Sequence, residues 1–148
     1  MMKWMLATAL LFAAHGATAT DAPSVSLHGT TFTTEFATSD AQREHGLMDR
    51  AHMDAQHSML FIFADDEPRS FWMKNTLIPL DILYFDKSRH LVAMQLNAQP
   101  CKGEPCALYP SGNQPARYVL ELNAGVAGKL GLKLGDELTV NGSPSAAQ

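Results

Sequence analysis

Short runs of apolar or alternating residues recur along the chain, and polar or glycine-containing turns separate them. Runs of this length and period are typical of β-strands rather than helices. The pattern predicts seven or eight short strands, and the candidate segments are residues 25–27, 32–37, 58–63, 69–73, 79–86, 91–96, 118–123 and 137–140. One segment carries clear helix signals: Ser39 can cap its start, Gln42 stands three residues later, and Gly46 can end it. We therefore expect a helix over Asp40–His45.

These elements indicate a mainly β fold, of the β-rich α+β kind, with one short helix after the second strand. Many short strands without alternating long helices are typical of a single-domain antiparallel β-sandwich or a partly closed barrel. The sequence contains no internal repeat and no sign of a second domain. We assign the domain to residues 20–141, and we expect residues 142–148 to form a disordered tail.

Residues 1–19 have the features of a secretory signal peptide. Lys3 provides a basic start, Trp4–Ala14 is a short apolar core, and Ala17–Ala19 has the small residues that a signal peptidase recognises. The apolar core is shorter than the ~20 residues that a membrane-spanning helix needs. We therefore expect cleavage near Ala19, a periplasmic or secreted protein, and no stable membrane anchor.

The charge of the chain excludes one class of function. The chain has 11 lysines and arginines against 15 aspartates and glutamates, a net charge of −4, and no basic cluster. Because nucleic-acid-binding proteins need a basic patch, we exclude that class.

The two cysteines are Cys101 and Cys106, and in an exported protein we expect them to form a structural disulfide. Their C-x4-C spacing differs from the C-x2-C spacing of redox-active pairs.

The most informative stretch is Phe71–Asp86, in which a polar corner joins two apolar strands. The second strand alternates, with Leu80, Ile82 and Tyr84 on one face and Asp81, Leu83 and Phe85 on the other. An unpaired carboxylate is costly to bury. We therefore expect Asp81 either to reach solvent or to be held by hydrogen-bond donors.

The same polar corner supplies the best candidate binding site. It combines aromatic, ammonium, amide, hydroxyl and carboxylate groups, from Trp72, Lys74, Asn75, Thr76 and Asp81. Such a combination is typical of pockets for small polar ligands. We expect a sugar-like or peptide-like ligand, or a segment of a partner protein, to bind at the Lys74–Asp81 corner. The loop between Cys101 and Cys106 would border this site.

Each side chain of the site has an expected role. Trp72 and Tyr109 would supply apolar walls, while Lys74 and Asn75 would donate hydrogen bonds. Asp81 would orient Lys74 or accept a hydrogen bond from the ligand. The structural alternative is that Trp72 belongs to the core and that Lys74 pairs with Asp81 only to fix the corner.

Other functions are also compatible with the sequence, although no common catalytic motif is present. Asp81 and Glu121 could act as the acid/base pair of an enzyme on cell-envelope carbohydrate, if both faced one cleft. A periplasmic Cu(I)-binding protein is a further alternative, because thioether and imidazole groups suit Cu(I). The candidate ligands are close in sequence: Met48, His52, Met53 and His57. The last alternative is a structural or assembly protein. We expect no cofactor.

Several sequence blocks resemble those of one protein family. They are GLM at 46–48, MLFIF at 59–63, FWMKNT at 71–76, IPLDILYFD at 78–86, VLELNAG at 119–125 and Gly135-Asp136 before the last strand. In these blocks the chain resembles domain of unknown function family 192, and the resemblance runs from about Val25 to Val140. It implies a compact β-rich domain, often exported, with no established activity. The family motif maps here to Gly46, Leu47, Met48, Met73, Lys74, Asn75, Thr76, Pro79, Leu80, Asp81 and Glu121. Three of the candidate copper ligands, His52, Met53 and His57, lie outside it.

Overall fold

The computed structural model describes residues 22–142, which form one seven-stranded sheet with two short helices. The predicted signal peptide and all but the first residue of the predicted tail lie outside the described residues. In chain order the elements are β1 (Ser24–Leu27), β2 (Thr30–Ala37), α1 (Asp40–His45), β3 (His57–Trp72), β4 (Leu80–Phe85), β5 (Leu91–Ala98), β6 (Leu108–Asn123), α2 (Val126–Leu130) and β7 (Thr139–Asn141).

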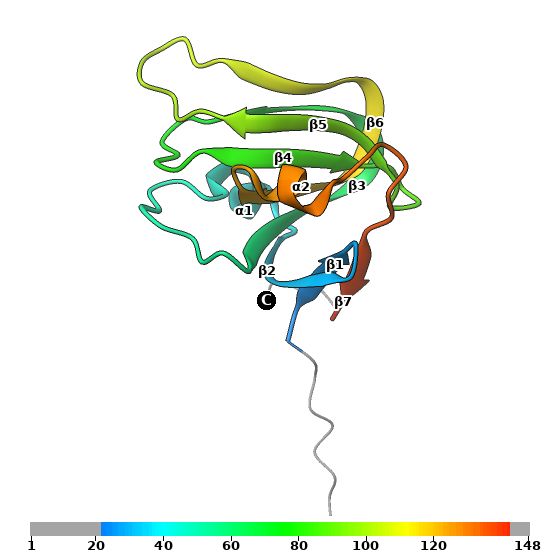
Figure 1. The fold of residues 1–148 in the computed structure, drawn as a ribbon. Helices are drawn as coiled ribbons and strands as arrows, with labels where there is room; N and C mark the ends of the chain where they lie inside the picture. Colours follow the sequence, from blue (N-terminus) through cyan, green and yellow to red (C-terminus); the bar gives the residue numbers. More distant parts are fainter. Residues whose placement is uncertain (1–21, 143–148) are drawn as a thin grey trace, which may run out of the picture.

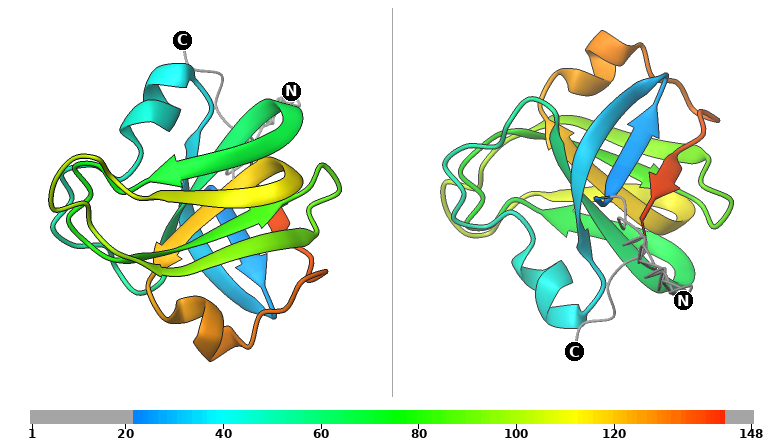
Figure 2. Two further views of the ribbon diagram at one scale, coloured as in Figure 1. Left: turned by 90° about the horizontal axis from the view of Figure 1, so that it is seen from above. Right: turned by 90° about the horizontal axis from the view of Figure 1, so that it is seen from below.

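The strands follow the order β5-β4-β6-β3-β2-β1-β7 across the sheet. Neighbouring strands are antiparallel except β2 and β3, which are parallel. Two parallel neighbours need a crossover connection, and here the crossover contains α1. The sheet curls on itself like half of a barrel (Figure 1), and α1 and α2 lie on opposite sides of it (Figure 2).

The predicted fold class is confirmed, because the protein is a β-rich single domain with a partly closed sheet. Of the two predicted architectures, the partly closed barrel agrees with the structure and the sandwich of two packed sheets does not. The structure also has a second short helix, α2, beyond the one that the sequence pattern predicts. Within residues 22–142, no helix is long and apolar enough to cross a membrane.

Each face of the curled sheet carries an apolar cluster, and β4 contributes to both. All residues of β4 are buried, and successive side chains of a strand point to opposite faces. Leu83 and Phe85 belong to the cluster that includes residues of α2. The cluster on the other face includes residues of the loop after α1, and β4 adds to it Leu80, Ile82 and Tyr84. The alternation predicted for this strand is therefore confirmed.

Strand β3 joins two segments that the sequence pattern separates. Residues 58–63 and 69–73 are the two ends of one strand. The polar residues between them stay extended because they pair with β6: Glu67 stands opposite Ala116, and Pro68 opposite Pro115. Register shifts on both sides of this part mark bulges. Bulges increase the local twist, which helps the sheet to curl.

Helix α1 begins and ends where the sequence predicts, and it covers the sheet only loosely. Ser39 and Gln42 form a complete capping box. Gly46 follows the helix at φ +50°, and a Cβ there would lie 3.2 Å from the Phe61 ring. Only glycine therefore lets the next loop pack so close to the sheet. No residue of α1 is buried, and Arg43 fixes the helix by donating to a backbone oxygen of β3 at 2.8 Å.

Candidate functional site

Asp81 is buried, and both of its carboxylate oxygens are bonded. It is 1 % exposed. Oδ1 accepts a hydrogen bond from the backbone N–H of Asn97, and Oδ2 accepts one from the N–H of Ala127, each at 2.9 Å. The second bond caps the start of α2, whose own N-cap residue, Gly125, has no side chain to do so. Asp81 is thus held by donors, which is one of the two states predicted for it, and it joins β4 to β5 and α2.

The structure corrects the predicted pairing of Lys74 with Asp81. The Lys74 ammonium lies 3.1 Å from Oε1 of Glu104 and 5.1 Å from the ring centroid of Trp72. Both oxygens of Asp81 are directed to backbone amides instead. Asp81 therefore neither orients Lys74 nor presents a free oxygen to a ligand at the corner.

The loop between Cys101 and Cys106 lies against the polar corner, and the predicted disulfide between them is confirmed. The backbone N–H of Cys101 donates to the carbonyl oxygen of Met73 at 3.1 Å. Glu104, in the middle of the loop, pairs with Lys74. A disulfide indicates an oxidising environment, such as that of exported proteins.

Asp81 and Glu121 lie on opposite faces of the sheet. In the pairing of β4 with β6, Asp81 stands opposite Leu122, and Ile82 stands opposite Glu121. Paired residues share a face and successive residues alternate, so the sheet separates the two carboxyl groups. An acid/base pair needs both groups in one cleft, about 5–9.5 Å apart. The geometry therefore contradicts the predicted Asp81–Glu121 pair.

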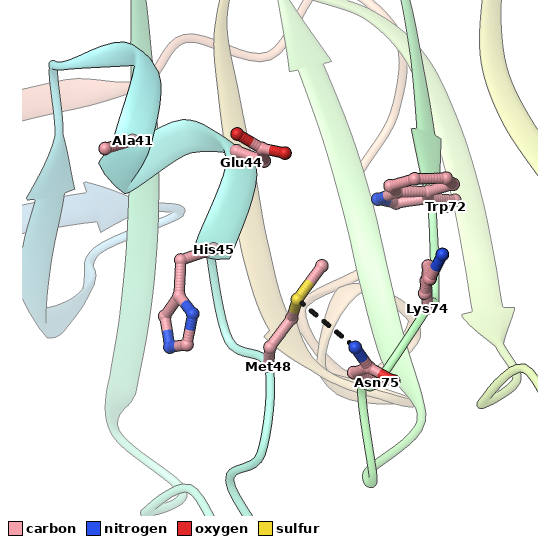
Figure 3. A pocket seen from close by; sticks show the side chains of 7 residues that line it. All are labelled: Ala41, Glu44, His45, Met48, Trp72, Lys74 and Asn75. Carbon is pink, nitrogen blue, oxygen red and sulfur yellow. Dashed lines mark hydrogen bonds between the residues drawn. The ribbon is translucent and has the colours of Figure 1, made fainter.

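An open hollow of about 360 Å³ lies between α1 and the end of β3 (Figure 3). It is lined by three residues of α1, one of the next loop, and three at and after the end of β3: Ala41, Glu44, His45, Met48, Trp72, Lys74 and Asn75. Trp72 is 43 % exposed, and in Figure 3 its indole nitrogen points toward α1. The amide nitrogen of Asn75 lies 4.0 Å from the sulfur of Met48.

The hollow contains three of the predicted binding residues, Trp72, Lys74 and Asn75. Glu44 and His45 are lining residues that the sequence analysis did not identify. They stand on a short exposed helix, and the parallel crossover from β2 to β3 brings that helix beside the end of β3. Glu44 and Lys74 carry opposite charges on the two sides of the hollow (Figure 3).

Tyr109 does not share the hollow with Trp72. It lines a neighbouring hollow of about 240 Å³ at the disulfide loop. Its hydroxyl there accepts a hydrogen bond from the backbone N–H of Gln99 at 3.1 Å. Trp72 and Tyr109 therefore line two neighbouring hollows, whereas the sequence analysis predicts that both supply apolar walls of one site.

A smaller cavity of about 30 Å³ adjoins the large hollow and reaches Glu121. Four residues line both spaces: Glu44, His45, Met48 and Trp72. Thr76, the remaining predicted residue, is buried and lines only the smaller cavity. Its hydroxyl donates to the backbone oxygen of Lys74 at 3.3 Å.

Glu121 is 5 % exposed, and no residue in the described part of the chain donates a hydrogen bond to its carboxyl. Burial raises the pKa of Glu121 to about 8. The carboxyl is therefore mostly neutral near pH 7, since burial penalises the charged form. A neutral carboxyl can both donate and accept a hydrogen bond.

The four candidate Cu(I) ligands are directed to different places. Met53 is buried in the core, and Met48 lines the hollow. His57 bonds to a carboxylate of β2 at 2.7 Å, and His52 lies 3.0 Å from the exposed Asp54. Among residues 22–142 there is no group of three or more His, Cys, Asp or Glu side chains that could hold a metal ion.

Comparison with known proteins identifies the family. The sequence model of DUF192 (domain of unknown function 192), described as "Uncharacterized ACR", matches residues 24–140. The chain belongs to this family. No curated protein gives a significant match.

Two solved structures are similar to this DUF192 protein. A protein of unknown function from Novosphingobium aromaticivorans DSM 12444 is 33 % identical, with a TM-score of 0.71 over 79 % of this chain and 82 % of that chain. A protein from Sinorhizobium meliloti 1021, described as a candidate transcription regulator, is 40 % identical. Its TM-score is 0.72, over 80 % of this chain and 94 % of that chain.

The DUF192 motif blocks divide into two groups in this structure. Asp81, in the block around β4, is a buried structural residue that anchors α2. The other blocks come from three separate parts of the chain, at 46–48, 73–76 and 121, and residues from each line the hollow or the adjoining cavity. The motif therefore converges on one place, the space between α1 and the sheet.

Proposed function

We propose that this DUF192 protein is an exported binding protein whose hollow takes a small, uncharged polar ligand of the sugar class. The observation that carries the proposal is the half-exposed Trp72 at a hollow of about 360 Å³ that also contains Lys74 and Asn75. An aromatic ring can pack against the apolar face of a sugar while polar side chains bond its hydroxyls. The volume lies within the range of about 300–1,000 Å³ that is typical of small-molecule pockets.

The charges around the hollow favour an uncharged ligand. Lys74 and Glu44 have opposite charges on its two sides, so either kind of ion would meet one repulsive group. A sugar hydroxyl, by contrast, can accept from an ammonium and donate to a carboxylate. An ammonium has three donors, and within the described residues Glu104 takes one of those of Lys74. The remaining donors are available to a ligand.

A segment of a partner protein is a second candidate for the same surface. Leu108 stands opposite Trp72 in the pairing of β3 with β6, and it is 65 % exposed. The two side chains form a small apolar surface beside the hollow, of the kind that a peptide side chain can cover. Leu108 is not part of the hollow's lining. Leu108→Ala should therefore weaken peptide binding and leave sugar binding unchanged.

The S. meliloti relative is described as a candidate transcription regulator, but we do not extend that description to this chain. The net charge of the present chain is −4, and its sequence has no cluster of lysines and arginines. Affinity for nucleic acid depends mainly on basic side chains that contact phosphates. A DNA-binding role therefore lacks its main physical requirement here.

A thermal-shift screen of the chain from Thr20 onward, against oligosaccharides and short peptides, tests the proposal. A ligand at about 100 times its Kd stabilises the folded state by about 2.7 kcal/mol, which raises the Tm by roughly 5–10 °C. We expect Lys74→Ala to lose most of the shift that a sugar produces. Lys87→Ala, at an exposed lysine after β4, is the matched control and should keep it. An equal shift in all three proteins would contradict a site at the hollow.

A further inference from the structure

The cavity at Glu121 has the size of a small chemical group. A cavity needs about 10–15 Å³ to hold one water molecule. The volume of about 30 Å³ at Glu121 therefore accepts two or three non-hydrogen atoms. Because this cavity shares four lining residues with the large hollow, a ligand in the hollow can extend a short arm into it.

The lining of the cavity combines polar side chains, among them Arg43, Glu44 and Thr76, with apolar ones and with the buried Glu121. Leu47, Phe61 and Phe71 contribute apolar side chains to its lining. Glu121 is 5 % exposed, its carboxyl has no hydrogen-bond donor among the described residues, and its oxygens are not fully enclosed. Buried polar groups in proteins are nearly always bonded, so a group like this needs an explanation. A hydrogen bond with a ligand or water would supply one.

The arm that fits must combine an uncharged oxygen acceptor with a small apolar end. A carboxylate arm would bring a further acidic group against the buried Glu121, in a cavity that Glu44 also lines, which is costly. A hydroxyl alone would leave the apolar side chains without contact. An acetamido group has a carbonyl oxygen, a carbonyl carbon and a methyl group beyond its nitrogen. These three atoms match both the size and the polarity of the cavity.

We propose that the ligand is an N-acetylated amino sugar whose acetamido group enters this cavity and accepts a hydrogen bond from the carboxylic acid of Glu121. The sugar ring stays in the large hollow beside Trp72, so this inference rests on the sugar-binding function proposed above. It adds the substituent that the site selects. The specificity residue is Glu121, while Trp72 and Lys74 contact the ring.

Two trisaccharides that differ only in this substituent provide the test. Tri-N-acetylchitotriose and cellotriose have the same β-1,4-linked backbone, with an acetamido or a hydroxyl group at C2. Isothermal titration calorimetry of the chain from Thr20 onward measures both affinities. A hydrogen bond between uncharged groups is worth a factor of about two to ten, and burial of the methyl group adds a factor of about four. We therefore expect tri-N-acetylchitotriose to bind at least about tenfold more tightly than cellotriose.

Two variants connect this preference to Glu121. Glu121→Leu removes the hydrogen bond at similar volume and should reduce the preference several-fold, leaving the part that the apolar contacts of the methyl group contribute. It should fold, since an apolar side chain replaces an unpaired buried acid. Glu121→Gln keeps an uncharged donor and should keep the preference.

The outcomes separate the two proposals. Equal binding of both trisaccharides, or tighter binding of cellotriose, would overturn the acetamido inference and leave sugar binding intact. A preference for tri-N-acetylchitotriose that is as large in Glu121→Leu as in the wild type would overturn the role of Glu121. Binding of neither trisaccharide would overturn the inference together with the sugar class that it rests on.

Discussion

Replacing Glu121 with glutamine is expected to stabilise the protein progressively as the pH rises from about 4 to about 9. Burial raises the pKa of Glu121 from its ordinary value of 4.5 to about 8 in the folded state. Between these values the folded protein holds a proton that the unfolded chain has lost. The stability of the wild type therefore falls as the pH rises through this window. Glutamine does not titrate, so the variant escapes this loss.

The linkage between proton binding and folding limits the stabilisation by Glu121→Gln to about 5 kcal/mol at pH values above 8. Urea unfolding of both proteins at several pH values measures it as the difference in free energy of unfolding. Glu67→Gln is the matched control, because this carboxyl is exposed and does not line the cavity, so its substitution should change the free energy of unfolding by less than about 0.5 kcal/mol. A Glu121→Gln difference that is the same at about pH 4 and about pH 9 would contradict a neutral buried acid.

Replacing Asp81 with alanine is expected to cost about 3–5 kcal/mol of the free energy of unfolding. The buried amides of Asn97 and Ala127 would lose their acceptors, and each hydrogen bond to a charged group contributes about 1.5–3 kcal/mol. The start of α2 would also lose its cap, since Gly125 cannot replace it.

Asp54→Ala is the matched control for this substitution. The Asp54 side chain is 87 % exposed and pairs only with an exposed histidine, so its loss should cost less than about 1 kcal/mol. Urea unfolding at neutral pH measures both variants. A loss for Asp81→Ala as small as that for Asp54→Ala would contradict the structural role that the hydrogen bonds assign to Asp81.

The local sequence pattern is sufficient to predict those parts of the structure that depend on residues close together in the chain. The alternation around Asp81 predicts both faces of β4, because the period of a strand is two residues. The capping residues Ser39 and Gln42 predict α1 for a similar reason, since a helix start is decided within one turn. The need of Asp81 for donors also follows from its place in an apolar strand.

The features that depend on distant residues could not be read from that pattern. The donors to Asp81 come from Asn97 and Ala127, which only the folded sheet brings close. Lys74 pairs with Glu104 rather than with Asp81, because the disulfide loop folds back onto the corner. No local signal specifies such contacts between separate segments.

The hollow itself is a consequence of topology. The parallel pairing of β2 with β3 requires a crossover, and that crossover sets Glu44 and His45 opposite the end of β3. The sequence therefore indicates one side of the site, and the fold supplies the other.

The central claim is that a sugar binds against Trp72, and the fluorescence of this residue tests it most directly. In the chain from Thr20 onward Trp72 is the one remaining tryptophan, because the other, Trp4, lies in the predicted signal peptide. Titration with tri-N-acetylchitotriose and with cellotriose up to about 10 mM covers ligands with a Kd of about 1 mM or tighter. We predict a saturable change in Trp72 emission with at least one of the two trisaccharides. Emission that stays unchanged with both would contradict the claim.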